Sequence, residues 1–495
     1  MNGPGFLERL EADARARPDR VFATFGDDAL TLGRLHAEAA DLATHLSGSG
    51  AERAAVMMDN SLAQISVIFG LAMAGVTWIP VNPRVVGQGL RYILEHSDPQ
   101  IIICDEHHRD AIEASGAPLS ECRSIESPHL AQIFAASPSP STVKRAPAGA
   151  DFALMYTSGT TGPPKGVQVT PRMMDFAGEG VRIGSGAEDG DVMFLWEPLC
   201  HIGGAQMLIL PLLVDVHLAM VPRFSASKFW DQVAETGATH IHYLGGILQM
   251  LLKQPARGDD KAHGVRTAWG GGCPAETWTA FEGRFAIPIR ECYGMSEASS
   301  LTSVNLTGKV GAVGRPMDWL DVSIQDPGPD GRGEILVRER EPGALFQGYF
   351  RNPEATARAL RNGTLHTGDL GSIDADGDLW FHGRLGDAIR VRGENVSAWE
   401  VESVAGSHPQ VEECAAVGVE AEVGEQEIKL FVRLAAEADL GMQALSEWLR
   451  PRLASFQLPR YYEPVAGFPR TPSQRVRKGE LDKSTDASWD RRASC

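Results

Sequence analysis

Cysteine is scarce in this sequence, and its placement excludes two common ways of stabilising a small domain. Seven cysteines occur among 495 residues, an odd number, and no two of them form a C-x-x-C pair. A disulfide framework and a structural zinc site are therefore not expected. We expect buried or incidental thiols without a covalent partner, as is usual in a reducing cytoplasm.

Long apolar runs are also missing. The most apolar stretch extends from Met207 to Val221 and is interrupted by Pro211, Asp215 and His217. It is shorter than the roughly 20 apolar residues that a membrane helix requires. The N-terminal segment MNGPGFLERLEADARARPDR contains no apolar core of a signal peptide. We therefore predict a cytoplasmic protein without a membrane span.

Positive charge is in deficit. Lys and Arg together number 46 and Asp and Glu 64, which gives a formal net charge of −18. A general nucleic-acid-binding protein carries a basic face, so nucleic acid is not an expected partner. The chain is 43% hydrophobic and 22% charged, which is typical of a globular enzyme, and its length predicts at least two domains.

Buried strands and helices alternate through the first two-thirds of the chain. Apolar runs predict strands, and helical spacing of apolar residues predicts amphipathic helices. The predicted strands are 54–58, 101–104 and 152–156, and the predicted helices are 35–46 and 62–74. This alternation predicts an α/β fold built of layers.

The pattern changes near residue 384. The segments that follow predict a short helix at 400–405, strands at 413–419 and 428–434, and a helix at 442–453. We therefore predict a large N-terminal domain of layered α/β subdomains at 1–384 and a small, mobile α+β domain at 385–495. The Pro- and Ser-rich stretch 137–147 is a predicted loop.

The strongest motif is YTSGTTGPPKG at 156–166. Glycines allow backbone N–H groups to approach an anion, and hydroxyl groups and one lysine add donors and positive charge. The motif is not a Walker A loop, because Lys165 precedes Gly166 rather than Ser or Thr. It predicts a polyphosphate site formed by Thr157, Ser158, Gly159, Thr160, Thr161, Gly162 and Lys165.

With this motif the chain resembles the AMP-forming adenylating enzymes, which include acyl-CoA ligases, peptide-synthetase adenylation domains and luciferases. The similarity covers essentially the whole chain. Further motifs follow in the family's order: PLCH at 198–201, GGGCP at 270–274, ECYGMSE at 291–297, TGDLG at 367–371 and GRLGD at 383–387. RGENVSAWEVE at 392–402 and the tail FPRTPSQRVRKGEL at 468–481 are most similar to carnitine/crotonobetaine-type acyl-CoA ligases.

The resemblance implies a role for each matching residue. Glu297 and Thr160 would hold Mg²⁺, Asp369 would accept both ribose hydroxyls, and Ser296 would donate to the α-phosphate. Tyr293 offers an aromatic face to adenine. The other implied nucleotide contacts are Gly271, Gly272, Cys273, Pro274, Glu291, Cys292, Gly294, Phe381, Arg384 and Arg390. The implied acid pocket is formed by His201, which lies next to the phosphates, and by Tyr243, Leu244, Gly245, Gly270, Gly271 and Met295.

The C-terminal tail departs from the family pattern. The family carries a lysine that contacts the carboxylate and the α-phosphate, and this chain has Arg475 at that place. Three alternatives are open: Arg475 performs the role, Lys478 replaces it after a loop shift, or the protein performs different chemistry. Arginine keeps the charge but is larger and forked, so the exchange is not conservative.

The resemblance implies a ligase that uses ATP and Mg²⁺ to adenylate a carboxylic acid and passes the acyl group to CoA. One alternative is an adenylating enzyme that activates an atypical acid such as nitrite, for diazotisation of an aryl amine, or that transfers acyl groups to an amine or a carrier protein. Another is a non-catalytic nucleotide-binding relative. A homodimer is left open.

Two pairs of histidines could have either a functional role or a purely structural one. His240 and His242 share one face of a strand, so that one of them could face the substrate, but packing or a surface position is the favoured interpretation. His107 and His108 lie near Glu106 and Asp110. Because adjacent residues rarely face one ion, we interpret this segment as a solvated loop rather than a metal site.

Overall fold

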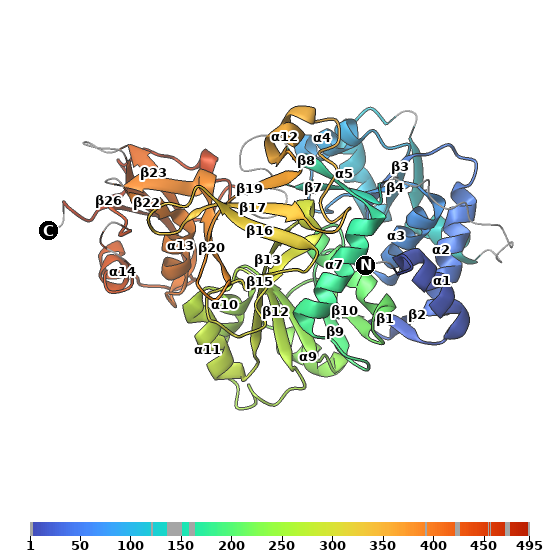
Figure 1. The fold of residues 1–495 in the computed structure, drawn as a ribbon, viewed down its shortest axis with the longest axis horizontal. Helices are drawn as coiled ribbons and strands as arrows, with labels where there is room; N and C mark the ends of the chain where they lie inside the picture. The colour runs from blue at the N-terminus through green and yellow to red at the C-terminus, as the bar shows by residue number, and fades with distance from the viewer. Residues whose placement is uncertain are drawn as a thin grey trace.

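The computed structural model describes residues 3–119, 122–135, 151–157, 164–391, 394–420, 426–453, 455, 457–470 and 476–493. The chain forms a large N-terminal domain and a smaller C-terminal domain, which lie side by side in Figure 1. Within the described residues, none of the helices combines the length and the apolar character that crossing a membrane would need.

One sheet of the large domain has six strands in the order β6-β5-β3-β4-β7-β8. All neighbours are parallel except β7 and β8, which are antiparallel. The carboxyl ends of β5, β3, β4 and β7 therefore lie at one edge. The strands are β3 (Arg53–Met57), β4 (Thr77–Pro80), β5 (Ile101–Cys104), β6 (Arg123–Glu126), β7 (Ala153–Thr157) and β8 (Lys165–Val169).

A second sheet has nine strands in the order β15-β14-β13-β12-β11-β9-β10-β1-β2. The neighbours from β13 to β1 are parallel, and the outer strands are antiparallel. The strands are β1 (Val21–Phe25), β2 (Asp28–Thr31), β9 (Val192–Leu195), β10 (His217–Met220), β11 (His240–Leu244), β12 (Thr267–Gly271), β13 (Ile289–Met295), β14 (Ser300–Val304) and β15 (Arg315–Pro316).

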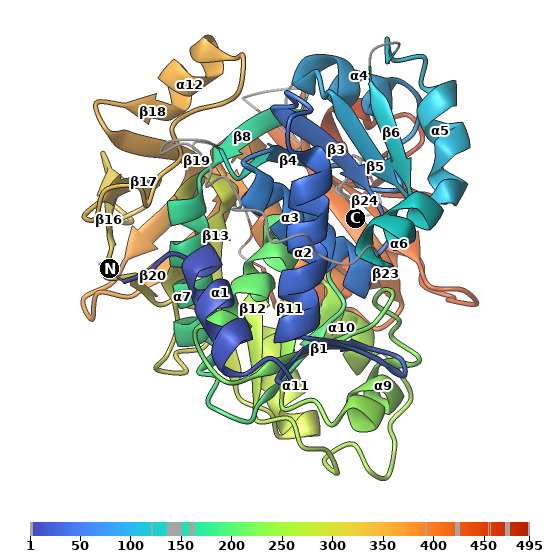
Figure 2. The same ribbon diagram turned by 90° about the vertical axis from the view of Figure 1, so that its right-hand side faces the viewer.

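Helix α3 (Leu62–Ala74) lies between these two sheets, because it contacts β4 of one sheet, β1 of the other and helix α2 (Leu32–Leu46), as Figure 2 shows. Eleven of its 13 residues are buried. The bounds predicted for this helix are confirmed, but the prediction that it is amphipathic is wrong. A helix that is covered on both sides has no solvated face, and its apolar residues therefore surround it.

The remaining helices of the large domain cover the sheets or connect their strands. The α-helices are α1 (Phe6–Ala16), α4 (Gly87–Ser97), α5 (Arg109–Ala114), α6 (Ser127–Ala135), α7 (Pro171–Ser185), α8 (Ile202–Ala205), α9 (Phe229–Thr236), α10 (Ile247–Leu252), α11 (Ala275–Phe285) and α12 (Pro353–Ala359). Short 3₁₀ helices are η1 (Glu106–His108), η2 (Gln206–Leu212), η3 (Ser296–Ala298) and η4 (Leu385–Asp387).

A five-stranded antiparallel sheet completes the large domain, in the order β16-β17-β19-β18 with β20 paired to β19. Its strands are β16 (Leu320–Gln325), β17 (Gly333–Glu339), β18 (Leu360–Arg361), β19 (Thr364–Ile373) and β20 (Leu379–Arg384). The pairing of β19 with β20 places Asp369 opposite Arg384. Helix η4 follows Arg384 directly and leads into the small domain.

The small domain has its own hydrophobic core, which lies between helices and strands of residues 389–489. Its elements are the hairpin of β21 (Ala388–Val391) and β22 (Glu394–Ser397), helix α13 (Ala398–Gly406), strands β23 (Val411–Glu420), β24 (Gln426–Leu434), β25 (Tyr461–Pro464) and β26 (Trp489–Asp490), helix α14 (Met442–Leu449) and η5 (Lys478–Glu480).

Polar contacts join the two domains at helices α10 and α11. The ammonium group of Lys253 donates to the carbonyl oxygens of Val411 and, at 3.4 Å, of Gly406. The hydroxyl of Ser407 donates to the Glu276 carboxylate at 3.0 Å. These contacts involve side chains at the surface, so they can be exchanged at small cost if the small domain turns.

The predicted α/β layers and the two domains are confirmed. The predicted strands and helices are present to within a few residues, except that α14 ends at Leu449 rather than at residue 453. The loop predicted at 137–147 lies outside the described residues. The domain boundary after residue 384 stays a prediction. The described cysteines are free thiols, as expected.

Candidate active site

The predicted site residues gather where parallel strands end. Lys165 begins β8 beside the end of β7, the segment from Trp196 to His201 follows β9, the glycine-rich turn begins at the end of β12, and η3 follows β13. Ligands of parallel α/β sheets bind beyond the carboxyl ends of the strands, because loops with free backbone groups meet there. Both large sheets thus contribute to one candidate active site.

Lys165 and Glu297 are brought together by Tyr349, a residue that sequence reasoning missed. The Nζ atom of Lys165 lies 5.0 Å from the centroid of the Tyr349 ring. The Tyr349 hydroxyl donates to Oε1 of Glu297 at 2.8 Å. Burial and the Glu297 charge raise the pKa of Tyr349, so its hydroxyl remains a donor. The sequence FQGYF around Tyr349 matches no motif used above and therefore gives no signal.

The phosphate loop itself lies outside the described residues. It includes Ser158, Gly159, Thr160, Thr161 and Gly162, and thus also the predicted metal ligand Thr160. Its two borders are described: Thr157 ends β7 and is paired with Lys165 at the start of β8. The antiparallel pairing of these strands sets both ends of the loop beside each other.

A second cluster forms around the buried carboxylate of Asp369. The Tyr293 hydroxyl donates to Oδ2 at 2.7 Å, and Nε of Arg384 lies 2.9 Å from Oδ1. The ring of Phe381 stacks on Tyr293 with a centroid distance of 5.7 Å. The three strands β13, β19 and β20 thus bring four predicted nucleotide-binding residues together. Burial and the Asp369 charge raise the pKa of Tyr293.

Glu291 connects the strand that carries it to the glycine-rich turn. Its Oε1 accepts hydrogen bonds from the N–H groups of Gly272 at 2.6 Å and Cys273 at 3.0 Å. Its Oε2 accepts the Tyr243 hydroxyl at 2.5 Å. Burial raises the pKa of Glu291 to about 7, although these hydrogen bonds favour the charged form. Glu291 and Tyr243 therefore fix the ends of β11, β12 and β13 relative to one another.

Glycine is required at the end of β12 and in the turn that follows it. Gly270 has a φ angle of +154°, and a Cβ atom there would lie 1.9 Å from the carbonyl oxygen of Tyr243. Gly272 has a φ angle of +91°, and the N–H of Gly245 donates to the carbonyl of Gly271 at 2.9 Å. Backbones from β11 and β12 thus meet without side chains between them.

The other predicted contacts lie around this turn. Leu244 is 45% exposed, whereas Tyr243, Cys273 and Cys292 are buried. Gly294 lies against β14, since a Cβ there would meet the Ser300 carbonyl oxygen at 1.7 Å. The remaining three flank the neighbouring helices: Pro274 is the N-cap of α11, and Met295 and Ser296 lie where β13 passes into η3.

His201 stands at the N-cap of α8, at the boundary between the two sheets. Its Nε2 lies 3.4 Å from Nδ2 of Asn82, which follows β4. The side chain of buried Asn60, which follows β3, donates to the Glu197 carbonyl at 2.8 Å and accepts the Leu199 N–H at 3.2 Å. Two strand ends of the six-stranded sheet therefore position the His201 segment. Sequence reasoning missed both asparagines.

The two histidines of β11 are buried and engaged by other side chains. Nδ1 of His242 contacts the carboxylate of Glu197, and its ring lies 4.2 Å from the ring of Trp269. His240 lies 2.9 Å from the Thr239 hydroxyl, and burial lowers its pKa to about 4. These contacts agree with the interpretation that both rings are packing residues.

Among the candidate cations of the small domain, Lys478 has described side-chain contacts. Nζ of Lys478 is 2.9 Å from Oε1 of Glu402 on α13. Arg475 lies outside the described residues. Arg390 lies on β21 opposite Asn395. Lys478 is thus paired within its own domain, whereas Lys165 and Glu297 meet at Tyr349.

Comparison with known proteins gives a consistent result. Family models described as "AMP-binding enzyme" and "AMP-binding enzyme C-terminal domain" match residues 10–350 and 400–475. A sulfoacetate–CoA ligase from Cupriavidus necator is 33% identical, over 93% of this chain and 92% of that protein. A crotonobetaine/carnitine–CoA ligase from Salmonella typhi is 29% identical, over 89% and 90% of the two chains.

A solved structure has the same fold over nearly the whole chain. It is the O-succinylbenzoate coenzyme A synthetase from Bacillus subtilis in complex with ATP and a magnesium ion. The TM-score is 0.84 at 24% sequence identity, and the match covers 97% of this chain and 99% of that one.

The Glu291 carboxyl group is expected to make the stability depend on pH. Because its pKa is raised to about 7 in the folded protein, the folded state keeps a proton that the unfolded chain releases near pH 4.5. The free energy of unfolding should therefore fall between about pH 4.5 and 7, by about 3 kcal/mol, and stay low above that range.

In Glu291→Gln, which has no titrating proton and keeps an acceptor for the turn, this decline should disappear. Urea unfolding of both proteins from about pH 4.5 to 8 measures the effect. Exposed Glu235 supplies the control, since Glu235→Gln should retain the decline of the wild type. A difference between Glu291→Gln and the wild type that does not change with pH would contradict the raised pKa.

Proposed function

This chain belongs to the AMP-binding enzyme family, and from that membership we propose that it is an ATP-dependent, AMP-forming ligase that adenylates a carboxylic acid and transfers the acyl group to CoA. The observation that carries the proposal is the similarity to CoA ligases over nine-tenths of the chain. ATP, Mg²⁺ and CoA are accordingly its cofactors. The sequence-based family prediction, including the similarity to carnitine-type ligases, is confirmed.

The described residues fit a magnesium–nucleotide complex. Mg²⁺ prefers carboxylate and phosphate oxygens. Of the two carboxylate oxygens of Glu297, only Oε1 is hydrogen-bonded to another described residue. Oε2 is therefore open to a cation. When bound, the ion would neutralise phosphate charge. Lys165 brings an ammonium group to the same place, and the stacked rings of Tyr293 and Phe381 offer a face for adenine.

We assign the first half-reaction to the large domain together with one cation from the C-terminal tail of the small domain. An oxygen of the acid's carboxylate forms a bond to the α-phosphorus of ATP, and pyrophosphate leaves. The acid is already a nucleophile, so the residues contribute positioning and charge stabilisation rather than general-base catalysis. Lys165, Ser296 and the loop 157–162 would hold the phosphates, and Asp369 and Arg384 would hold the ribose.

The second half-reaction requires the small domain to move. We place the hinge at Gly386, where a residue without a side chain can absorb the backbone rotation, and the moving part at 385–495. The contacts of Lys253 with Val411 and of Ser407 with Glu276 would then be exchanged. The CoA sulfur bonds to the carbonyl carbon of the acyl-adenylate, and AMP leaves with the electron pair of the broken bond.

The acid pocket would lie between His201 and the turn at Gly270–Gly272. His201 is half-buried at a helix N-cap, and exposed Leu244 reaches toward Gly203, two residues after His201. The departure at Arg475 supports a second candidate, an adenylating enzyme for an atypical acid or a different acceptor. A cytoplasmic location and a homodimer stay predictions.

The first test is ATP-dependent pyrophosphate release by the wild-type protein. The panel contains short, branched, aryl and arylacrylic acids, sulfoacetate, 2-succinylbenzoate and carnitine, and also nitrite, each with and without CoA. We expect release with at least one carboxylic acid and a thioester only when CoA is present. Release with nitrite and an aryl amine would favour the second candidate. If none of the acids gave pyrophosphate release, both candidates would be contradicted.

The substitution Lys165→Ala should lower the rate of pyrophosphate release by about 10²–10³-fold, because a positive charge that stabilises the phosphates of ATP in the transition state is lost. The matched control is Lys261→Ala, which removes an exposed lysine outside the motifs. Near-normal activity of Lys165→Ala would refute the role assigned to this lysine.

The two cations of the tail can be distinguished by separate half-reactions. We expect Arg475→Ala to lower adenylation strongly and Lys478→Ala only weakly, because Lys478 is paired with Glu402. Thioester formation from a supplied acyl-adenylate should change little in either variant. The reverse order of effects would assign the role to Lys478.

A further inference from the structure

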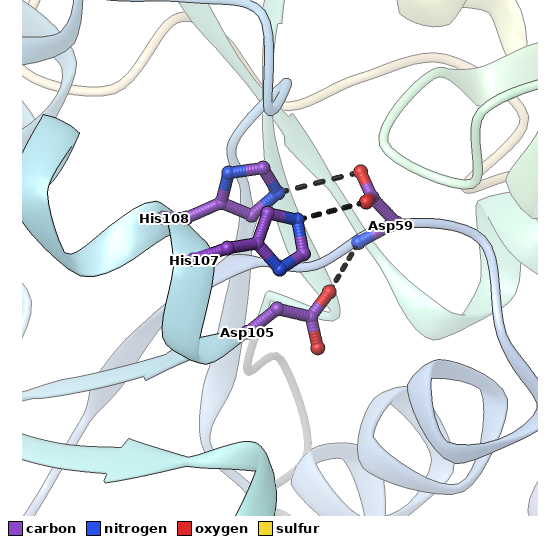
Figure 3. A group of neighbouring side chains, drawn as sticks. All are labelled: Asp59, Asp105, His107 and His108. Atoms are coloured by element: carbon purple, nitrogen blue, oxygen red, sulfur yellow. Dashed lines mark hydrogen bonds and ion pairs between the residues drawn. The ribbon is translucent and has the colours of Figure 1, made fainter.

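Two aspartates and two histidines meet at the carboxyl edge of the six-stranded sheet, and none of them belongs to the motifs of the adenylation site. Asp59 follows β3 and Asp105 follows β5, which are parallel neighbours with Met57 opposite Cys104. His107 and His108 lie in η1, directly after Asp105. Figure 3 shows both rings pointing toward the Asp59 carboxylate.

The distances fit a small ion. Nε2 of His107 lies 3.0 Å from Oδ2 of Asp59, and Nε2 of His108 lies 3.3 Å from Oδ1. One ligand atom from each of the four side chains lies within 4.8 Å of the others. Ligands about 2.1 Å from a tetrahedral zinc ion are about 3.4 Å apart, so small side-chain rotations suffice.

The cluster is supported by its surroundings and open to solvent. Oδ2 of Asp105 accepts the N–H of Asp59 at 2.7 Å, and Oδ1 accepts the Ser127 hydroxyl at 2.7 Å. These bonds orient Asp105 as second-shell partners orient metal ligands elsewhere. The side chains of Asp59 and His107 are 60% and 62% exposed, so an ion can enter, whereas His108 is 13% exposed.

The interpretation of the His107–His108 segment as a solvated loop stays a prediction, and the arrangement gives a reason to propose the metal-site alternative. The 3₁₀ turn places the two rings 4.0 Å apart, and both face the same carboxylate. The partners are Asp59 and Asp105 rather than the sequence neighbours Glu106 and Asp110. Asp59 lies 48 residues away along the chain, so only the pairing of β3 with β5 reveals it.

We propose that Asp59, Asp105, His107 and His108 form a binding site for a divalent transition-metal ion of the Zn²⁺ type. Two imidazole nitrogens and two carboxylate oxygens are the ligand set that such ions accept. Mg²⁺ and Ca²⁺ prefer oxygen ligands alone, so this site is distinct from the magnesium position at Glu297.

A second acidic cluster in the chain is not proposed as a metal site, because a lysine already occupies it. Nζ of Lys309 lies 2.5, 2.7 and 3.3 Å from carboxylate oxygens of Asp374, Asp376 and Asp378. The ammonium group takes the position of a cation and neutralises part of the negative charge. The cluster at Asp59 holds no such built-in cation among the described residues, and its two imidazoles can be neutral ligands.

The site is connected to the segment that carries His201. Asp59 is followed by Asn60, whose side chain binds the backbone of Glu197 and of Leu199. An ion that holds Asp59 also restrains Asn60 and through it the start of the His201 segment. Metal binding should therefore raise the thermal stability of the protein, whether or not the proposed ligase activity is present.

The test is metal binding to the full-length protein after removal of metals with EDTA. Titrations with Zn²⁺ and with Co²⁺ are measured by calorimetry and by equilibrium dialysis with metal analysis. They should show one tightly bound metal ion per chain. Mg²⁺ should not compete at similar concentrations. Zn²⁺ should raise the melting temperature, and the visible absorption of bound Co²⁺ should be far stronger than that of hydrated Co²⁺.

The double variant Asp59→Ala/His107→Ala should lose at least about tenfold in Zn²⁺ affinity together with the melting-temperature shift. The matched control Glu106→Gln/Asp110→Asn, in the same turn, should bind as the wild type does. If the double variant folds poorly in EDTA, the conservative variant Asp59→Asn takes its place. Wild-type protein without saturable binding, or variants that bind equally well, would overturn the proposal.

Discussion

The candidate active site depends on the buried carboxyl group of Glu291. This side chain stands on β13 and accepts hydrogen bonds from the turn after β12 and from Tyr243 on β11. Those three strands are adjacent in the nine-stranded sheet. One group thus joins three strand ends, and leaving one of its buried partners unsatisfied would cost about 1–3 kcal/mol. The glycines of the turn are required because the backbone of β11 lies directly against them.

The carboxylates of the site are hydrogen-bonded or ion-paired with other side chains of the protein. The Tyr349 hydroxyl binds Glu297, and Tyr293 with Arg384 binds Asp369. Under the proposed function, a cation would approach the open Oε2 of Glu297, and ribose hydroxyls would take hydrogen-bond positions at Asp369. The internal partners limit the cost of burying these carboxylates without ATP.

The carboxyl edge of the six-stranded sheet connects the two proposed sites. Along this edge lie Asp105 after β5, Asp59 and Asn60 after β3, Asn82 after β4 and Thr157 at the end of β7. Asn60 and Asn82 position the His201 segment, and Asp59 and Asp105 belong to the proposed metal site. Their proximity follows from parallel pairing, because every parallel strand delivers its next residue to the same edge.

The sequence by itself determined the family, the α/β layers and most of the nucleotide-binding motifs. Strand and helix patterns, the glycine-rich loop and segments such as ECYGMSE are encoded within a few neighbouring residues, so they can be read locally. Only the tertiary structure decided that helix α3 is covered on both sides, that Tyr349 joins Lys165 to Glu297, and that Asp59 meets His107 and His108. These contacts join residues far apart along the chain, and the packing and strand order of the sheets bring them together, which no local pattern records.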